Sequence, residues 1–379
     1  MIWFFLLSGL FLGWSLGAND AANVFGTAVG SRMVRFRVAA LVASLGVIAG
    51  AVSGGAGAAG TLTQLGGVNA LAGSFAVALA AGLTVAGINR AALPVSTSQA
   101  IIGAIIGWNL FTGSPTDAGV LARIVTAWVL SPVLAAGFAI LLYVLTRWWL
   151  RRARIHLVSL DAYTRVGLLA VGAFGAYALG ANNIANVMGV FVPASPFEPV
   201  ALGAWGQVTS TQQLFLLGAL AIAVGIHTHS YRVMTTVGSQ IFRLTPVLAL
   251  VVVLAQALVL FLFSSVALQA WLSRAGFPAP PLVPVSSTQA IIGAILGIAI
   301  VKGGKGLHFG TLGRVAMGWV LTPVIAGATS LVLLFVVQNV FEQEVLAAPA
   351  PPPVAEAPAT VPADSLRMPA DTVATRAAP

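Results

Sequence analysis

Membrane-length apolar stretches follow one another along most of the chain, and few charged residues interrupt them. A helix needs about 20 apolar residues to cross the hydrocarbon layer of a membrane. Hydrophobic residues make up 59% of the sequence and charged residues only 7%, whereas a soluble domain carries about 25% charged residues. Most of the surface must therefore face lipid. We expect an all-α polytopic membrane protein with about ten to twelve membrane segments.

The remaining composition excludes several classes of site. The chain has no cysteine, which excludes disulfides, thiolate metal sites and thiol nucleophiles. Its four histidines form no HExxH pattern, and no P-loop of an ATP-driven pump occurs. The net charge of +9 comes from basic residues between apolar stretches, which is typical of loop charge that sets orientation and not of nucleic-acid binding. The first residues lack the features of a signal peptide, so we expect a retained first span.

Three blocks of sequence occur twice in the same order. In membrane transporters such repeats often place the substrate between the two copies, near the middle of the membrane; a duplication without a site is the alternative. We predict a first repeat over 1–150, a linker over 151–164, a second repeat over 165–344 and a disordered Ala/Pro-rich tail over 345–379. The matching blocks are 17–26 with 180–189, PVSTSQAIIGAIIG at 94–107 with PVSSTQAIIGAILG at 284–297, and RIVTAWVLSPV at 123–133 with RVAMGWVLTPV at 314–324.

Basic residues are distributed in opposite ways in the two copies. In the first copy they follow the first block, and none lies between residues 108 and 122, after the second block. In the second copy none lies between residues 166 and 231, and they follow the second block instead. Because basic loops stay in the cytoplasm, the copies should have inverted topology, with a cytoplasmic linker and both termini outside. The residues concerned are Arg32, Arg35 and Arg37, then Arg147, Arg151, Arg152 and Arg154 in and beside the linker, then Lys302, Lys305 and Arg314.

Asp20 is the only acidic residue inside an apolar stretch. A carboxylate in the middle of a membrane costs roughly 2.5–3.5 kcal/mol even on the insertion scale, and a bound cation would offset that cost. Alternatively, Asp20 is a structural residue that caps a broken helix or is protonated. Asparagines recur beside it at four-residue spacing, on one helix face. One such amide could serve helix packing, but the matched set favours a cation site made of Asp20, Asn19, Asn23, Asn182, Asn183 and Asn186.

The two serine-rich blocks have the pattern of an anion site. In each block a proline is followed by Ser/Thr residues and an apolar stretch, which predicts the start of a helix. The free backbone N–H groups and the positive end of the helix dipole bind phosphate-like anions. Ordinary N-capping by the hydroxyl groups is the alternative. The residues of this candidate phosphate site are Ser96, Thr97, Ser98, Gln99, Ser286, Ser287, Thr288 and Gln289.

From about residue 5 to 340 the chain resembles the inorganic phosphate transporters of the PiT family, through the segments GANDAANVFGTAVGSR, GANNIANVMG, PVSTSQ and PVSSTQ. The resemblance implies an inverted repeat with two re-entrant helical hairpins, a homodimer in the cell membrane, and phosphate uptake coupled to sodium or protons without a cofactor. By the same resemblance, the Ser/Thr residues would contact phosphate. Sodium would bind at Asp20, Asn23, Asn183 and Asn186, and Gln99 and Gln289 would help to line the cation and anion sites.

One position departs from the family pattern. Many members carry Asp where this chain has Asn183, and the missing charge should weaken one cation site or change the coupling ratio. A sulfate permease of the same family and an anion channel are the alternatives to a phosphate symporter. An enzyme is not indicated, because a hydrolase would need paired catalytic groups and only one acidic residue lies in an apolar stretch.

Overall fold

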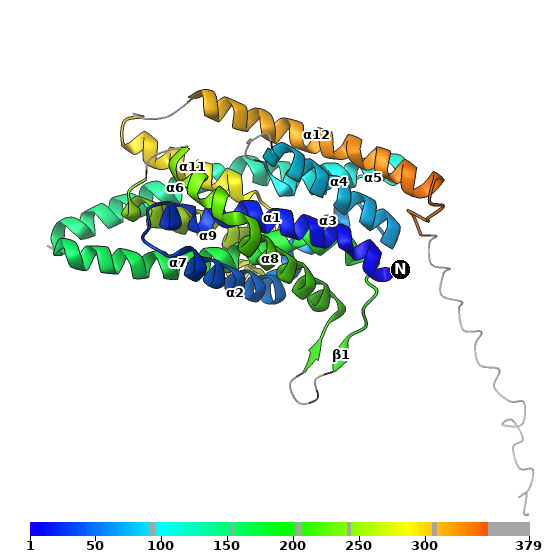
Figure 1. The fold of residues 1–379 in the computed structure, drawn as a ribbon, viewed down its shortest axis with the longest axis horizontal. Helices are drawn as coiled ribbons and strands as arrows, with labels where there is room; N and C mark the ends of the chain where they lie inside the picture. The colour runs from blue at the N-terminus through cyan, green and yellow to red at the C-terminus, as the bar shows by residue number, and fades with distance from the viewer. Residues whose placement is uncertain are drawn as a thin grey trace, which may run out of the picture. The chain divides into compact units, whose positions relative to one another are not determined.

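The structure is a computed structural model that describes residues 1–90, 95–153, 155–201, 203, 206–240, 244–304 and 309–347. It consists of α-helices and one short β-hairpin (Figure 1). In chain order the helices are α1 (Ile2–Gly30), α2 (Phe36–Gly54), α3 (Ala56–Leu65), α4 (Leu71–Arg90), α5 (Thr97–Thr112), α6 (Ala118–Ala153), α7 (Leu157–Met188), the 3-10 turn η1 (Gly189–Phe191), α8 (Ser210–Gln240), α9 (Pro246–Ser264), α10 (Val266–Arg274), α11 (Ser287–Val301) and α12 (Phe309–Asn339).

Eight helices in the described part of the chain are long and apolar enough to cross a membrane, namely α1, α2, α4, α6, α7, α8, α9 and α12. The prediction of an all-helical multi-pass membrane protein is therefore confirmed. The helices α5 and α11 have 16 and 15 residues. At 1.5 Å per residue each falls short of a hydrocarbon core about 30 Å thick. The expected ten to twelve segments are reached only when these shorter helices are included.

Helices from one half of the chain pack mainly against helices from the other half. α1 packs along α8, and α2 packs along α7. The approach is close because glycines stand at the crossings. A Cβ atom on Gly17 of α1 would lie 2.0 Å from the Ile222 carbonyl oxygen, and one on Gly180 of α7 would lie 2.2 Å from the Val47 carbonyl oxygen. Since Gly17 and Gly180 occupy the same position in the first repeated block, matching glycines make matching contacts.

The short helices pack in the same exchanged manner, α5 along α12 and α11 along α6. A Cβ atom on Gly103 would lie 2.1 Å from the Pro323 carbonyl oxygen, and one on Gly293 would lie 2.2 Å from that of Pro132. Both prolines lie inside their helices. The GxxxG spacings of the sequence thus bring α5 and α11 against the backbones of α12 and α6, as expected for packing glycines.

The chain termini and the connections between helices lie at two opposite ends of the helices. Figure 1 shows the N-terminus of α1 and the last turn of α12 at one end of the helices, and the junction of α6 and α7 at the opposite end. The hairpin of β1 (Val200–Ala201) and β2 (Gln207–Val208) is antiparallel, with Val200 opposite Val208. It lies at the end that holds the N-terminus (Figure 1).

The last described residues pack against α5. Val345, which the sequence assigned to a disordered tail, is buried. Its carbonyl oxygen accepts a hydrogen bond from Trp108 Nε1 at 3.0 Å. The remainder of the predicted tail, from residue 348 onward, lies outside the described residues.

Candidate functional site

Each serine-rich block begins a helix inside the protein. Ser96 is the N-cap of α5, and its Oγ accepts a hydrogen bond from the backbone N–H of Gln99 at 3.3 Å. Ser286 caps α11 in the same way, with Gln289 N–H at 3.2 Å. Ordinary capping therefore accounts for the first serine of each block. The hydroxyl groups that follow, at positions 97, 98, 287 and 288, are buried and do not cap these helices.

The starts of α5 and α11 are joined by a reciprocal pair of hydrogen bonds. Ser98 Oγ donates to the Val285 carbonyl oxygen at 3.1 Å, and Thr288 Oγ1 donates to the Val95 carbonyl oxygen at 3.2 Å. Ser98 and Thr288 are equivalent in the repeat, as are Val95 and Val285. The two helix N-termini, each with a partial positive charge, therefore lie close together although almost two hundred residues, about the length of one repeat, separate them along the chain.

Asp20 lies beside this junction and is 2% exposed. One carboxylate oxygen, Oδ2, accepts hydrogen bonds from Ser287 Oγ at 2.7 Å and from Asn183 Nδ2 at 3.0 Å. The other oxygen, Oδ1, accepts one from Asn19 Nδ2 at 2.9 Å. All three donors are neutral, and the one salt bridge found among the described residues, between Arg165 and Asp161, is elsewhere. Both oxygens of the carboxyl group thus have hydrogen-bond donors, and no basic side chain of the described residues forms a salt bridge with it.

Asparagines extend the cluster between α1 and α7. Asn186 Nδ2 donates to Ser98 Oγ at 2.8 Å and to Asn183 Oδ1 at 3.3 Å. Asn23 Nδ2 donates to Ser287 Oγ at 3.3 Å. One connected network therefore links the start of α5, the last turns of α7, the second half of α1 and the start of α11. This network joins residues of the predicted cation site to Ser98 and Ser287 of the predicted anion site.

Several buried oxygens of the cluster have no hydrogen-bond partner in the described part of the chain. They are Thr97 Oγ1, Gln99 Oε1, Gln289 Oε1 and Asn186 Oδ1. Buried polar atoms are nearly always paired with protein, water or a ligand. Three of these four atoms are amide oxygens, which can only accept, so they suit a cation, a water molecule or a protonated oxyanion. The matched glutamines of the two repeats thus present equivalent free acceptors.

The residues fit a sodium ion with one adjustment. Sodium is a hard cation that prefers carboxylate and amide oxygens, and Asp20 and Asn186 Oδ1 supply such atoms. Asn183 and Asn23 direct their amide nitrogens into the network. A half-turn about the last side-chain bond exchanges the amide nitrogen for the oxygen. That rotation would convert two donors into two further cation ligands.

Two residues of the predicted cation site have few or no hydrogen bonds to the cluster. Asn19 is only partly buried and touches the cluster through Asp20. Asn182 is fully buried, and neither atom of its amide bonds to any described residue. The sequence reading missed the carbonyl groups of Val95 and Val285, which receive the reciprocal hydrogen bonds. Their place directly before the two capping serines, repeated in both halves, was the available signal.

A family model described as "Phosphate transporter family" matches residues 16–164, 158–270 and 282–370. The chain belongs to the phosphate transporter family. Because the members of this family are transporters, the expectation that the chain is not an enzyme is confirmed. The matched ranges include Asp20, both asparagine groups and both Ser/Thr-Gln blocks.

Similar proteins from distant organisms agree with this assignment. A protein of Methanocaldococcus jannaschii that carries the name of a phosphate permease is 28% identical, over 85% of this chain and 93% of its own length. The chloroplastic inorganic phosphate transporter 2-1 of Arabidopsis thaliana is 23% identical, over 86% of this chain and 70% of its own. A solved structure titled "The sodium-dependent phosphate transporter" has a TM-score of 0.69 at 21% identity and covers 89% of this chain and 98% of its own. That likeness establishes a shared fold.

Proposed function

We propose that this member of the phosphate transporter family imports inorganic phosphate across the cell membrane by symport with a cation, either sodium or a proton. The observation that carries the proposal is the hydrogen bond between Ser287 Oγ and Asp20 Oδ2 at 2.7 Å. It ties the start of α11 to the one carboxylate within the apolar stretches. A substrate anion at the helix start and a cation at the carboxylate would therefore stabilise one another, which is the physical requirement for symport.

Phosphate would bind between the starts of α5 and α11. The backbone N–H groups of these starts and the hydroxyl groups of Thr97 and Ser287 are the donors that a tetrahedral oxyanion requires. Gln99 Oε1 and Gln289 Oε1 can accept hydrogen bonds from a phosphate that still carries a proton. Sulfate has no proton at neutral pH and would gain nothing from those acceptors, which favours phosphate over sulfate.

The coupling cation would bind between α1 and α7. Asp20 would supply the charge, and the amide oxygens of Asn23, Asn183 and Asn186 would supply neutral ligands. The name of the solved relative mentions sodium dependence, which favours sodium for this chain. With Asn183 at the position equivalent to Asp20, we infer a single carboxylate-based cation site.

The exchanged helix contacts support an inverted repeat. In the repeat, α1, α2, α5 and α6 correspond to α7, α8, α11 and α12. The contact of α1 with α8 therefore corresponds to that of α7 with α2, and the contact of α5 with α12 corresponds to that of α11 with α6. The reciprocal bonds of Ser98 and Thr288 follow the same rule. The short helices α5 and α11, which start at this interface, are consistent with one arm of each predicted re-entrant hairpin.

The charges support a cytoplasmic linker and external termini. Arg147, Arg151 and Lys302 line one cavity, and Arg165 Nη1 donates to the Met33 carbonyl oxygen at 2.9 Å beside the α1–α2 connection. Basic residues therefore gather at the end of the helices where α6 meets α7, opposite the N-terminus (Figure 1). The positive-inside rule assigns that end to the cytoplasm. The apolar outer faces of α6 and α12 would meet lipid and, in a homodimer, a second copy.

Uptake of labelled phosphate into proteoliposomes tests the proposal. We expect saturable accumulation against a phosphate gradient that depends on an imposed sodium or pH gradient, with weak competition by sulfate. Accumulation that requires neither gradient would refute symport. Flux that only equilibrates phosphate would identify a channel, and full competition by sulfate would identify a broader oxyanion carrier.

A further inference from the structure

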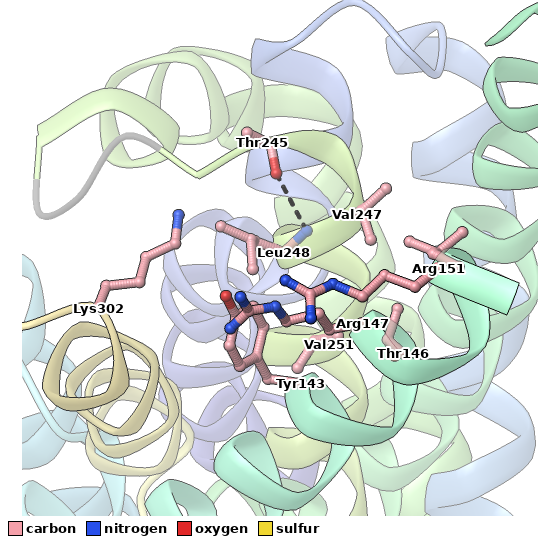
Figure 2. Close-up of a pocket in the computed structure, with 10 residues that line it drawn as sticks. Tyr143, Thr146, Arg147, Arg151, Thr245, Val247, Leu248, Val251 and Lys302 are labelled. Carbon is pink, nitrogen blue, oxygen red and sulfur yellow. Dashed lines mark hydrogen bonds between the residues drawn. The ribbon is translucent and has the colours of Figure 1, made fainter.

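A cavity of about 360 Å³ lies away from the Asp20 cluster, at the end of the helices where basic residues gather. It is formed by the end of α6, the start of α9 and the C-cap of α11 (Figure 2). Neither the proposed phosphate site nor the cation site includes any residue of its wall. The lining residues are Tyr143, Thr146, Arg147, Leu150, Arg151, Thr245, Val247, Leu248, Val251 and Lys302.

The charge in this cavity is entirely positive. Figure 2 shows Arg147 and Arg151 reaching across the cavity from α6 and Lys302 standing on the opposite side. Its lining contains no aspartate or glutamate, and no salt bridge of these three side chains occurs within the described ranges. Arg147 and Arg151 are four residues apart on one helix, a spacing at which like charges destabilise each other. A bound anion would relieve that repulsion.

The start of α9 adds the positive end of a helix dipole and the hydroxyl group of Thr245 to the cavity wall. Thr245 is the N-cap of this helix, and its Oγ1 accepts the hydrogen bond of Leu248 N–H at 3.4 Å, drawn in Figure 2. The positive end of the α9 dipole therefore faces the three basic side chains across the cavity. Guanidinium groups together with a helix N-terminus are the usual partners of a phosphate group.

The rest of the wall is apolar, which distinguishes this cavity from a site for a free ion. Leu150 and Val247 are the partly exposed apolar side chains of the wall, and Leu248 and Val251, which also line it, are buried. Free inorganic phosphate has no group that would use such a surface. A phospholipid has both parts, a charged phosphodiester and an acyl chain.

The end of α6 also has the features of a membrane interface. Trp148 and Trp149 are 53% and 52% exposed, and tryptophan gathers at the level of lipid headgroups. The Arg152 guanidinium lies over the Trp148 ring, 4.4 Å from its centroid. The neighbouring cavity therefore opens at the depth where phosphodiester groups are found.

We propose that this cavity binds the phosphodiester headgroup of an anionic phospholipid, with an acyl chain against the partly exposed Leu150 and Val247. The lipid would hold the ends of α6, α9 and α11 together. Because Lys302 is the C-cap of the same helix whose N-cap is Ser286, the lipid would steady the helix that carries half of the proposed phosphate site. The proposal requires the basic cavity only and does not depend on the coupling ion.

Native mass spectrometry of the full chain from nanodiscs tests the proposal. One nanodisc would contain phosphatidylcholine alone and the other phosphatidylcholine with phosphatidylglycerol. We expect a retained phosphatidylglycerol adduct, and the triple change Arg147→Gln, Arg151→Gln and Lys302→Gln should weaken it about a hundredfold, because each basic group near a membrane surface contributes about fivefold. Retention of equal strength in that variant would overturn the proposal.

A matched control removes charge elsewhere on the surface. The pair Arg35→Gln and Arg37→Gln should leave the adduct in place, and its loss there would show a general surface-charge effect instead of a site. Inorganic phosphate should not displace the lipid; complete displacement would make the cavity a free-anion site. If the triple variant fails to fold, the unmodified protein provides a second test. Its preference for phosphatidylglycerol over phosphatidylcholine must fall as the salt concentration is raised. A preference that is insensitive to salt would exclude a charge-based site.

Discussion

In the first copy of the repeat the buried acidic position is Asp20, and in the second copy the equivalent position is Asn183. The two side chains meet, since Asn183 Nδ2 donates to Asp20 Oδ2 at 3.0 Å. A second carboxylate at this distance would repel the first and would need a proton or a cation between them. The amide instead donates a hydrogen bond to the carboxyl group, so the two copies share one acidic side chain.

The hydrogen bonds and helix contacts around these two residues are almost the same in the two copies. The bonds from Ser98 to Val285 and from Thr288 to Val95 differ by only 0.1 Å in length, at 3.1 and 3.2 Å. A Cβ atom added to Gly103 or to Gly293 would lie at almost the same distance, 2.1 or 2.2 Å, from a proline carbonyl oxygen of the opposite half. The duplication has therefore kept the hydrogen bonds and the helix packing around the site in both copies, whereas an acidic residue is present in only one. Substitutions can test whether the two copies are equivalent in packing but different in their acidic residue.

The largest effect is expected from removing the charge. Asp20→Asn should abolish ion-driven accumulation of phosphate in proteoliposomes and leave the thermal unfolding temperature close to that of the unmodified protein, because an amide of equal size can keep part of the network. Asp161→Asn, at an exposed salt bridge, is the control and should accumulate phosphate normally. Undiminished accumulation by Asp20→Asn would remove this carboxylate from the mechanism.

Exchanging the two residues sharpens the comparison. The double change Asp20→Asn with Asn183→Asp moves the charge to the second copy and should recover part of the lost accumulation. Asn182, whose buried amide has no partner among the described residues, could then donate to the new carboxylate as Asn19 donates to Asp20. If the double variant is as inactive as Asp20→Asn alone, the two positions are not functionally equivalent.

Equivalent hydroxyl groups should differ in effect. Ser287 donates to the Asp20 carboxylate, whereas the equivalent Thr97 Oγ1 has no partner in the described chain. A hydrogen bond to a charged group contributes about 1.5–3 kcal/mol. Ser287→Ala should therefore raise the half-saturating concentration of the coupling cation by about tenfold to a hundredfold, and Thr97→Ala should change it less. Both changes should raise the half-saturating phosphate concentration; equal cation effects would contradict the assigned asymmetry.

The smallest effects, and the most similar ones between the two copies, are expected from the glycines at the helix contacts. Gly103→Ala and Gly293→Ala each place a Cβ atom against a proline carbonyl oxygen and should lower the free energy of unfolding by about 1–3 kcal/mol, as overpacking does. Gly137→Ala in α6 has nothing within 4 Å and serves as the control. Thermal unfolding in detergent measures all three. A clear difference between the first two would show that the halves do not pack equivalently.

The membrane class, the sequence repeat and the polar residues that cluster around Asp20 were readable from the sequence. A chain this apolar must use lipid as its solvent, and Asp20 is conspicuous because an unpaired carboxylate is costly there. The matched asparagines and Ser/Thr-Gln blocks followed from the repeat, and the family model and the relatives confirm the resemblance to phosphate transporters. The site roles themselves stay predictions that the variants above would test.

The tertiary structure decided which of these residues meet. Sequence spacing puts Asn19 and Asn23 on one face of α1. It cannot say that Ser287, from the second half of the chain, donates to Asp20 while its equivalent Thr97 has no hydrogen-bond partner among the residues that the structure describes. It also cannot place Lys302 opposite Arg147 and Arg151, since loops that are distant in sequence come together only when helices pack. Local physics fixes which segments enter the membrane and where helices begin. Which side chains share a bond or a cavity depends on how close-packed glycines let the helices of the two halves approach.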